Sequence, residues 1–124
     1  MNNANLLLFS ADDVVVRAAC GAVLRTRHAL RVIDTWADAL NEIETGCLGA
    51  TLAIIDLDPR LHAVDLLSLL HRRMPVLMLG YQHDGIIDRI LRRRGAAGYL
   101  LKPIDSVALV EAIDSVEHTG LAWV

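Results

Sequence analysis

Short apolar runs alternate with amphipathic stretches along the whole chain, and this alternation limits the possible folds more than any other feature. Five such runs occupy residues 5–10, 29–34, 51–55, 75–79 and 97–101. They are short and rich in Leu, Ile and Val, which is typical of strands buried on both faces of a parallel sheet. The run at 29–34 alternates apolar with polar residues and therefore predicts a strand less strongly.

The stretches between the runs place apolar residues at helical spacing, as Ile86, Ile87, Ile90 and Leu91 do. Capping residues stand where helices would begin and end. We expect Asp12 or Asp13 to open the first helix, Thr35 or Asp38 to open the second, and Gly46 and Gly95 to end the second and the fourth. A fifth helix is expected over 107–117. Strands and helices alternating five times predict an α/β fold with helices on both faces of the sheet.

The chain has 124 residues, so we expect one domain, residues 1–124, with its core at about 5–118. The apolar tail at 119–124 is either tucked against the domain, used in an interface, or the cut end of a longer protein. A net charge of −3 argues against nucleic-acid binding, which needs excess positive charge. The sequence shows neither a membrane-spanning run nor a basic leader, which indicates a cytoplasmic protein without membrane contact.

Acidic and basic side chains follow three of the predicted strands. Asp12 follows the first run, Asp56 and Asp58 the third, and Lys102 the fifth. Ligands of open α/β sheets bind at the carboxyl ends of the strands. Carboxylates suit Mg²⁺ and a lysine suits phosphoryl oxygens, so these residues form a candidate site. The alternative is structural: Asp56 caps the next helix and Lys102 pairs with it across the rim.

A stretch near the end of the chain is more specific. Residues 95–103 read GAAGYLLKP, and this run resembles the receiver domain of two-component response regulators, the CheY-like superfamily. The resemblance extends over roughly residues 5–118. It implies a flavodoxin-like doubly wound parallel sheet with strand order 2-1-3-4-5. It also implies a signalling phosphoprotein of a phosphorelay rather than an enzyme. A small flavodoxin-like enzyme or cofactor carrier is less well supported, because no glycine-rich phosphate loop follows the first run.

The resemblance assigns roles residue by residue. Asp56 matches the phosphoacceptor, which takes a phosphoryl group from a histidine kinase or phosphotransfer protein. Tyr99 matches the aromatic switch residue, and Pro103 a proline that often follows a cis bond. The remaining matches are to phosphoryl-binding positions (Lys102, Gly80, Tyr81) and to Mg²⁺ ligands (Asp12, Asp56, the backbone carbonyl of Asp58, and Asp13 if the register shifts by one residue).

The chain also departs from the family pattern. Ala11 occupies the position of the first acid, and Gly80 stands where the family has Ser or Thr. The loop after Asp56 lacks the usual glycine pattern. Two hypotheses follow. In the first, Asp56 is phosphorylated with Mg²⁺ and switches protein contacts. In the second, the chain is a pseudo-receiver that acts as an interaction module without phosphorylation.

Charged residues of the last two predicted helices suggest an interface. In many receivers the face formed by the fourth helix, the fifth strand and the fifth helix makes the dimer contact. Arg89, Arg92 and Arg93 on one helix complement Asp105 and Glu111 at the other, so a two-fold axis would pair each set with its counterpart. We expect a homodimer through this face. The alternative is a solvated basic helix end that favours cations.

Overall fold

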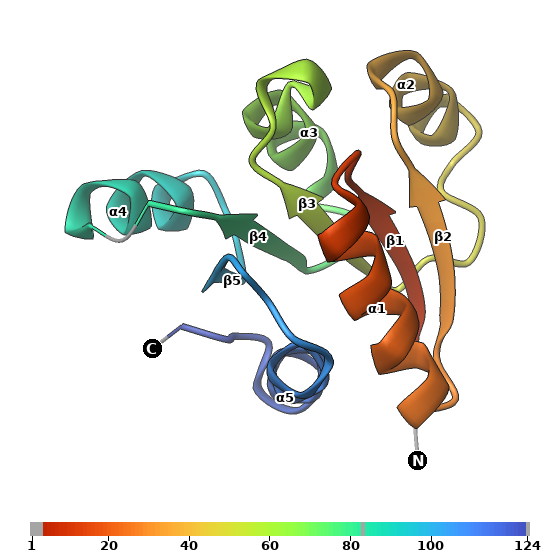
Figure 1. The fold of residues 1–124 in the computed structure, drawn as a ribbon. Helices are drawn as coiled ribbons and strands as arrows, with labels where there is room; N and C mark the ends of the chain where they lie inside the picture. Colours follow the sequence, from red (N-terminus) through yellow and green to blue (C-terminus); the bar gives the residue numbers. More distant parts are fainter. Residues whose placement is uncertain (1–3, 83, 124) are drawn as a thin grey trace.

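The computed structural model describes residues 4–82 and 84–123 of the chain. Five parallel strands form one sheet in the order β2-β1-β3-β4-β5 (Figure 1). The strands are β1 (Asn5–Phe9), β2 (Ala29–Ile33), β3 (Leu52–Asp56), β4 (Val76–Gly80) and β5 (Gly98–Leu101). This is the flavodoxin-like strand order that the sequence predicts.

Helices connect the strands and cover both faces of the sheet. Helices α1 (Asp13–Arg25) and α5 (Ser106–Thr119) lie on one face. Helices α2 (Trp36–Glu44), α3 (Ala63–Leu70) and α4 (Gly85–Arg93) lie on the other, with the short 3₁₀ turn η1 (Pro59–Leu61) ahead of α3. Each face therefore buries its own aliphatic cluster.

Burial along the strands follows their place in the sheet. Strands β3 and β4 are buried at every position, while β2 at the edge is buried only at Ile33. This difference explains why the run at 29–34 alternates in polarity and the central runs do not. The largest fully buried side chains are aliphatic apart from Phe9.

Element boundaries differ from the sequence expectation by a few residues. Asp12 caps α1 and Thr35 caps α2, and Gly46 and Gly95 follow their helices with left-handed φ angles. Strand β3 extends to include Asp56, so Asp56 does not cap a helix. The cap of the following turn is Asp58, and η1 itself was not expected.

The C-terminal segment packs against the domain. Ala122 N donates to Ala97 O at 2.9 Å, which places the segment beside the start of β5. Trp123 Nε1 donates to Ala96 O at 3.3 Å, and the Arg92 guanidinium lies 4.2 Å from the centre of its ring. The described part of the tail is thus tucked against the domain, while a role in an interface and a longer protein stay predictions. Val124 lies outside the described residues.

Within the described residues, no helix has both the length and the apolar character needed to cross a bilayer.

Candidate functional site

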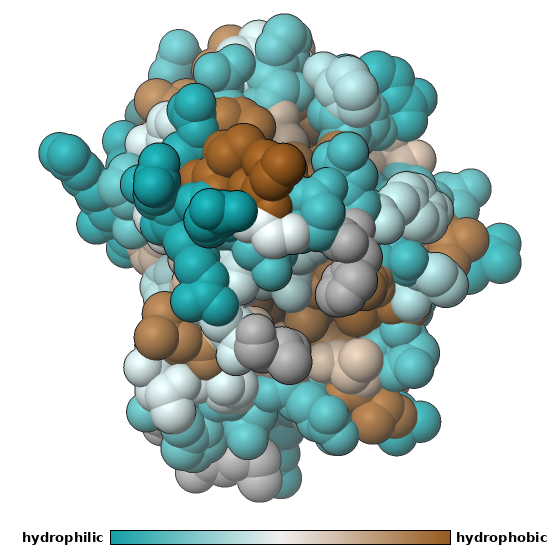
Figure 2. Space-filling view, turned by 90° about the vertical axis from the view of Figure 1, so that its left-hand side faces the viewer, coloured by the Kyte–Doolittle hydropathy of each residue, from teal (hydrophilic) through white to brown (hydrophobic). Residues whose placement is uncertain are grey.

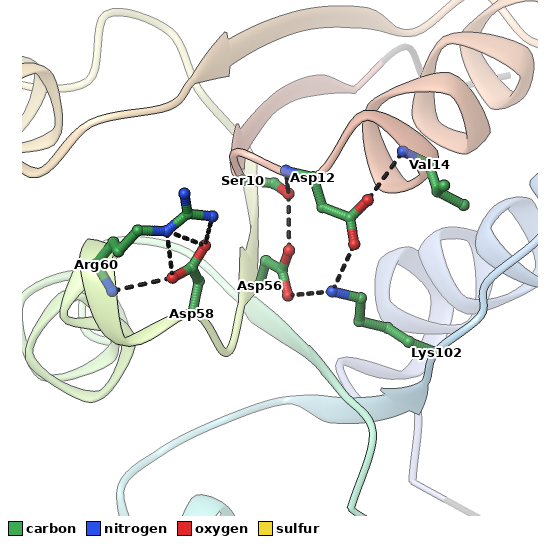
Figure 3. Close-up of polar contacts among 7 residues, drawn as sticks. All are labelled: Ser10, Asp12, Val14, Asp56, Asp58, Arg60 and Lys102. Carbon is green, nitrogen blue, oxygen red and sulfur yellow. Dashed lines mark hydrogen bonds and ion pairs between the residues drawn. The ribbon is translucent and has the colours of Figure 1, made fainter.

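The carboxyl ends of β1 and β3 and the residue after β5 meet at one edge of the sheet. Strands β1 and β3 pair in register, with Phe9 opposite Ile55. The next position on each strand therefore brings Ser10 beside Asp56. Lys102 follows β5 directly and reaches the same place across the end of β4 (Figure 3).

Asp56 is the centre of this cluster and is only 2% exposed. Its Oδ1 accepts from Lys102 Nζ at 2.9 Å, and its Oδ2 accepts from the Ser10 hydroxyl at 2.8 Å. Both carboxylate oxygens therefore have a partner, as a buried charge requires.

Asp12 completes the cluster from the start of α1. Its Oδ1 accepts from Val14 N at 2.9 Å, and its Oδ2 lies 2.9 Å from Lys102 Nζ. The hydrogen bond from Lys102 lowers the pKa of Asp12 below its ordinary value, although burial opposes the shift. Burial alone would lower the pKa of Lys102, but its hydrogen bonds to Asp56 and Asp12 outweigh this effect and raise it. Lys102 is the only lysine of the chain, and it bridges the two acids in its charged form.

The role of Ser10 is not among the sequence expectations. Its hydroxyl donates to Asp56, and the same oxygen accepts from Asp12 N at 3.1 Å. The signal was present, because a polar residue directly after a buried run must find a partner at the sheet edge. Ser10 and Ala11, not two acids, are the residues that follow β1.

The side chains of Asp58 and Asp13 lie apart from the cluster, while the ligand expected at Asp58 is its backbone carbonyl, whose role stays a prediction. The Asp58 carboxylate turns to Arg60, whose Nη2 lies 2.7 Å from Oδ2, and the hydrogen bonds from Arg60 lower the pKa of Asp58. Asp13 is exposed on the first turn of α1. Among the contacts of the described residues, neither side chain joins Asp56 or Lys102.

The magnesium ion implied by the resemblance does not fit this donor set. An ammonium already lies between the two carboxylates that would hold the ion. The other oxygen of Asp56 faces a hydroxyl donor. Across residues 4–82 and 84–123, no three His, Cys, Asp or Glu side chains are grouped so that they could hold a metal ion.

Gly80, the last residue of β4, and Tyr99, near the start of β5, are placed together. Tyr99 is buried, and its hydroxyl donates to Gln82 O at 2.6 Å. A Cβ atom at Gly80 would lie 2.7 Å from the Tyr99 hydroxyl and 2.9 Å from Leu57 Cδ1. The space of a side chain at position 80 is thus occupied by Tyr99, and glycine is the residue that permits this packing. Burial raises the pKa of the phenol.

Tyr81 lies at the rim of the site. It is 69% exposed, and its ring centre is 4.7 Å from Lys102 Nζ. This distance is within the range of a cation–π contact, so Tyr81 covers the ammonium from the solvent side. The Lys102–Pro103 peptide bond is cis, as the resemblance implies.

The sequence of the chain matches no protein-family model and no curated protein. Its fold is similar to that of solved receiver domains. The chemotaxis response regulator CheY4 of Vibrio cholerae superposes with a TM-score of 0.80 at 16% identity, over 93% of this chain and 99% of that one. The signal receiver domain of a modulated diguanylate cyclase from Desulfovibrio desulfuricans superposes with a TM-score of 0.76 at 18% identity, over 94% and 95%.

A pilus assembly protein also has this fold. CpaE of Caulobacter crescentus superposes with a TM-score of 0.76 at 20% identity, over 94% of this chain and 95% of the other. At such identities the likeness establishes the fold and leaves the chemistry of the site open. The predicted receiver fold is therefore confirmed.

Proposed function

We propose that this chain is a receiver-type signalling module that acts through protein contacts, without a phosphoryl group on Asp56. The observation that supports the proposal most directly is the closed state of Asp56. One oxygen is bound to Lys102 and the other to Ser10, with 2% of the residue exposed. An incoming phosphoryl group would have to displace one of these donors.

Two further features support this proposal. Ala11 stands at the position of the first acid, so one member of the acidic pair of the family pattern is missing while Asp12 is retained. The side-chain space at Gly80 is occupied by Tyr99, so the aromatic residue lies inward without any phosphoryl group. Because Tyr99 already lies inward, a phosphoryl group on Asp56 is not needed to move this ring. We expect no catalytic turnover from such a module.

A phosphodonor experiment tests this proposal. The chain is incubated with acetyl phosphate and Mg²⁺, and its intact mass is measured beside a receiver that accepts phosphate under the same conditions. We expect no adduct. Beryllofluoride is added in parallel, because it would reveal a site whose phosphorylated form is short-lived. An adduct that disappears in Asp56→Asn contradicts the proposal.

Phosphorylation of Asp56 by a histidine kinase, with Mg²⁺ as cofactor, is the second candidate function. It is favoured by the ammonium of Lys102 at 2.9 Å from Asp56, because a lysine in this place can pair with phosphoryl oxygens. Ala11→Asp separates the two candidates further. If the missing acid is what prevents metal binding, this variant gains beryllofluoride and Mg²⁺ binding that the parent chain lacks.

The output surface that we propose is the face of α4, β5 and α5. Ile86, Ile90, Leu101 and Val107 are exposed there. On the side of the molecule that holds α4, a hydrophobic patch is bordered by strongly hydrophilic side chains (Figure 2). The charged residues expected to pair across a two-fold axis are all exposed: Arg89, Arg92, Arg93, Asp105 and Glu111.

A homodimer through this face is the arrangement we propose. Exposed ion pairs contribute only about 0.2–1 kcal/mol each, so the apolar side chains must supply most of the affinity. Sedimentation of the parent chain is compared with Arg93→Glu and with Ile90→Ala. We expect Ile90→Ala to weaken the dimer more than Arg93→Glu. A parent chain that remains monomeric at high concentration refutes the dimer and leaves the face as a docking surface for another protein.

A further inference from the structure

Positive charge gathers at the edge of the sheet opposite Asp56. Six of the chain's 12 Arg and Lys residues lie between positions 72 and 94: Arg72, Arg73, Arg89, Arg92, Arg93 and Arg94. Among the described residues, Arg31 and Arg60 form ion pairs, and none of these six does. Arg89, Arg92 and Arg93 belong to the face proposed for the homodimer, so Arg72, Arg73 and Arg94 carry the charge that is available to another partner.

A groove of about 410 Å³ lies within this basic region. One wall is formed by His71, Arg72 and Arg73, which follow α3, and the other by Gly95 and the segment Gly120–Leu121. Its lining residues 71–75 and 95–97 precede β4 and β5, so the groove lies at the amino ends of these strands, away from Lys102.

The floor of the groove is apolar. Met74, Ala96 and Ala97 line it and are almost fully buried, while Leu121 at the rim is 55% exposed. Gly95 has φ +96°, and the His71 ring packs in the space that a Cβ atom at Gly95 would occupy. The groove therefore combines a hydrophobic base with guanidinium groups around its mouth.

We propose that this groove binds an acidic peptide segment of a partner protein, with apolar side chains on the floor and carboxylates against the arginines. The guanidinium fork matches a carboxylate in two parallel hydrogen bonds. In Arg73 only Nη1 donates a hydrogen bond, to Ile43 O at 3.1 Å, so the Nε and Nη2 groups of its guanidinium can bind a carboxylate.

A short peptide fits this surface better than a nucleic acid does. Asp84 and Asp88 lie within the same segment 72–94, which leaves 13 of the 15 carboxylates against the other six cations, so the rest of the chain is strongly acidic. A long polyanion would meet that surface and be repelled. The groove also lacks an exposed aromatic ring among its lining residues, and bases bind single-stranded sites by stacking on such rings.

The probe is a short fluorescein-labelled peptide in which glutamate alternates with leucine. Its binding is followed by anisotropy and by ¹H–¹⁵N NMR shifts of the whole chain. We expect shifts at Arg72, Gly95 and Leu121, and roughly tenfold weaker binding in Arg72→Glu/Arg73→Glu. The charge-matched control Arg25→Glu/Arg27→Glu, at two arginines that do not line the groove, leaves the affinity nearly unchanged.

Further measurements make the result decisive. Circular dichroism confirms that each variant is folded, and Arg72→Gln/Arg73→Gln replaces the double charge reversal if that variant is not folded. A peptide with glutamine in place of glutamate should bind more weakly. The proposal is overturned if the acidic peptide causes no shifts, if the control variant weakens it equally, or if an oligonucleotide binds more tightly. Because Asp56 is untouched, these outcomes are independent of the phosphodonor result.

Discussion

Replacement of Lys102 by methionine tests whether the bridge between Asp12 and Asp56 stabilises the fold. The side chains of Lys102 and Asp56 are 8% and 2% exposed, so the substitution leaves a buried carboxylate with one hydroxyl partner. Breaking a buried ion pair by removing one partner costs about 3–5 kcal/mol. The carboxylate of Asp12 is 27% exposed and regains water, so we expect the lower end, about 3 kcal/mol.

The same substitution in an Asp56→Asn background isolates the buried pair. Only the half-exposed contact with Asp12 is then lost, worth about 1 kcal/mol. The difference between the two backgrounds is a coupling of about 2 kcal/mol. Urea unfolding measures this coupling. With a denaturant slope of about 2 kcal/mol/M, the loss of about 3 kcal/mol in Lys102→Met lowers the urea midpoint by roughly 1.5 M.

A matched control comes from the other acid–base pair near the site. Arg60 is exposed where it meets Asp58, so Arg60→Met should hardly move the urea midpoint. If Lys102→Met costs less than about 1 kcal/mol, or costs the same in both backgrounds, the pair behaves as a surface ion pair. The description of Asp56 as a closed, buried site would then be wrong.

Three more predictions concern single positions. Since its lysine partner lowers the pKa of Asp12, the stability advantage over Asp12→Asn is present above the ordinary value of 3.8 and is lost as pH falls through the lowered pKa; urea unfolding at several pH values checks this. Gly80→Ser should cost about 1–3 kcal/mol and displace the Tyr99 ring in NMR spectra; an unmoved ring at full stability would contradict the packing. Gly95→Ala should lower the melting temperature more than Gly46→Ala, because both have left-handed φ angles but only Gly95 also contacts an imidazole; equal losses would mean that backbone strain alone matters.

The fold could be predicted because burial in a parallel sheet leaves a simple pattern in the sequence. Strands buried on both faces, such as Ala53–Ile55 within β3, have to be continuous apolar runs. The topology then brings the residues after β1, β3 and β5 to one edge, so the meeting of Asp12, Asp56 and Lys102 was foreseeable. The chemical roles assigned to them remain predictions.

The details of the site depend on side-chain geometry that spacing does not determine. From the sequence alone, the Asp58 side chain could face either the cluster or its own loop. It faces the loop because the turn of η1 brings Arg60 within reach of its carboxylate. The hydroxyl of Ser10 points to Asp56 because of the β1–β3 register, which a sequence alone leaves open. Tyr99 is fixed inward by the absence of a side chain at Gly80, a relation between residues on different strands.

The buried ammonium also gives the chain a natural chemical reporter. Lys102 is the only lysine, and its amine reacts with acylating reagents only when it is deprotonated and free of both carboxylates. After digestion, only the peptide that contains this residue has to be followed. Its acylation rate, relative to that of a free lysine, measures how often the site opens. Any protein or ligand that tightens or loosens this edge of the sheet can therefore be detected by the rate at which one nitrogen reacts.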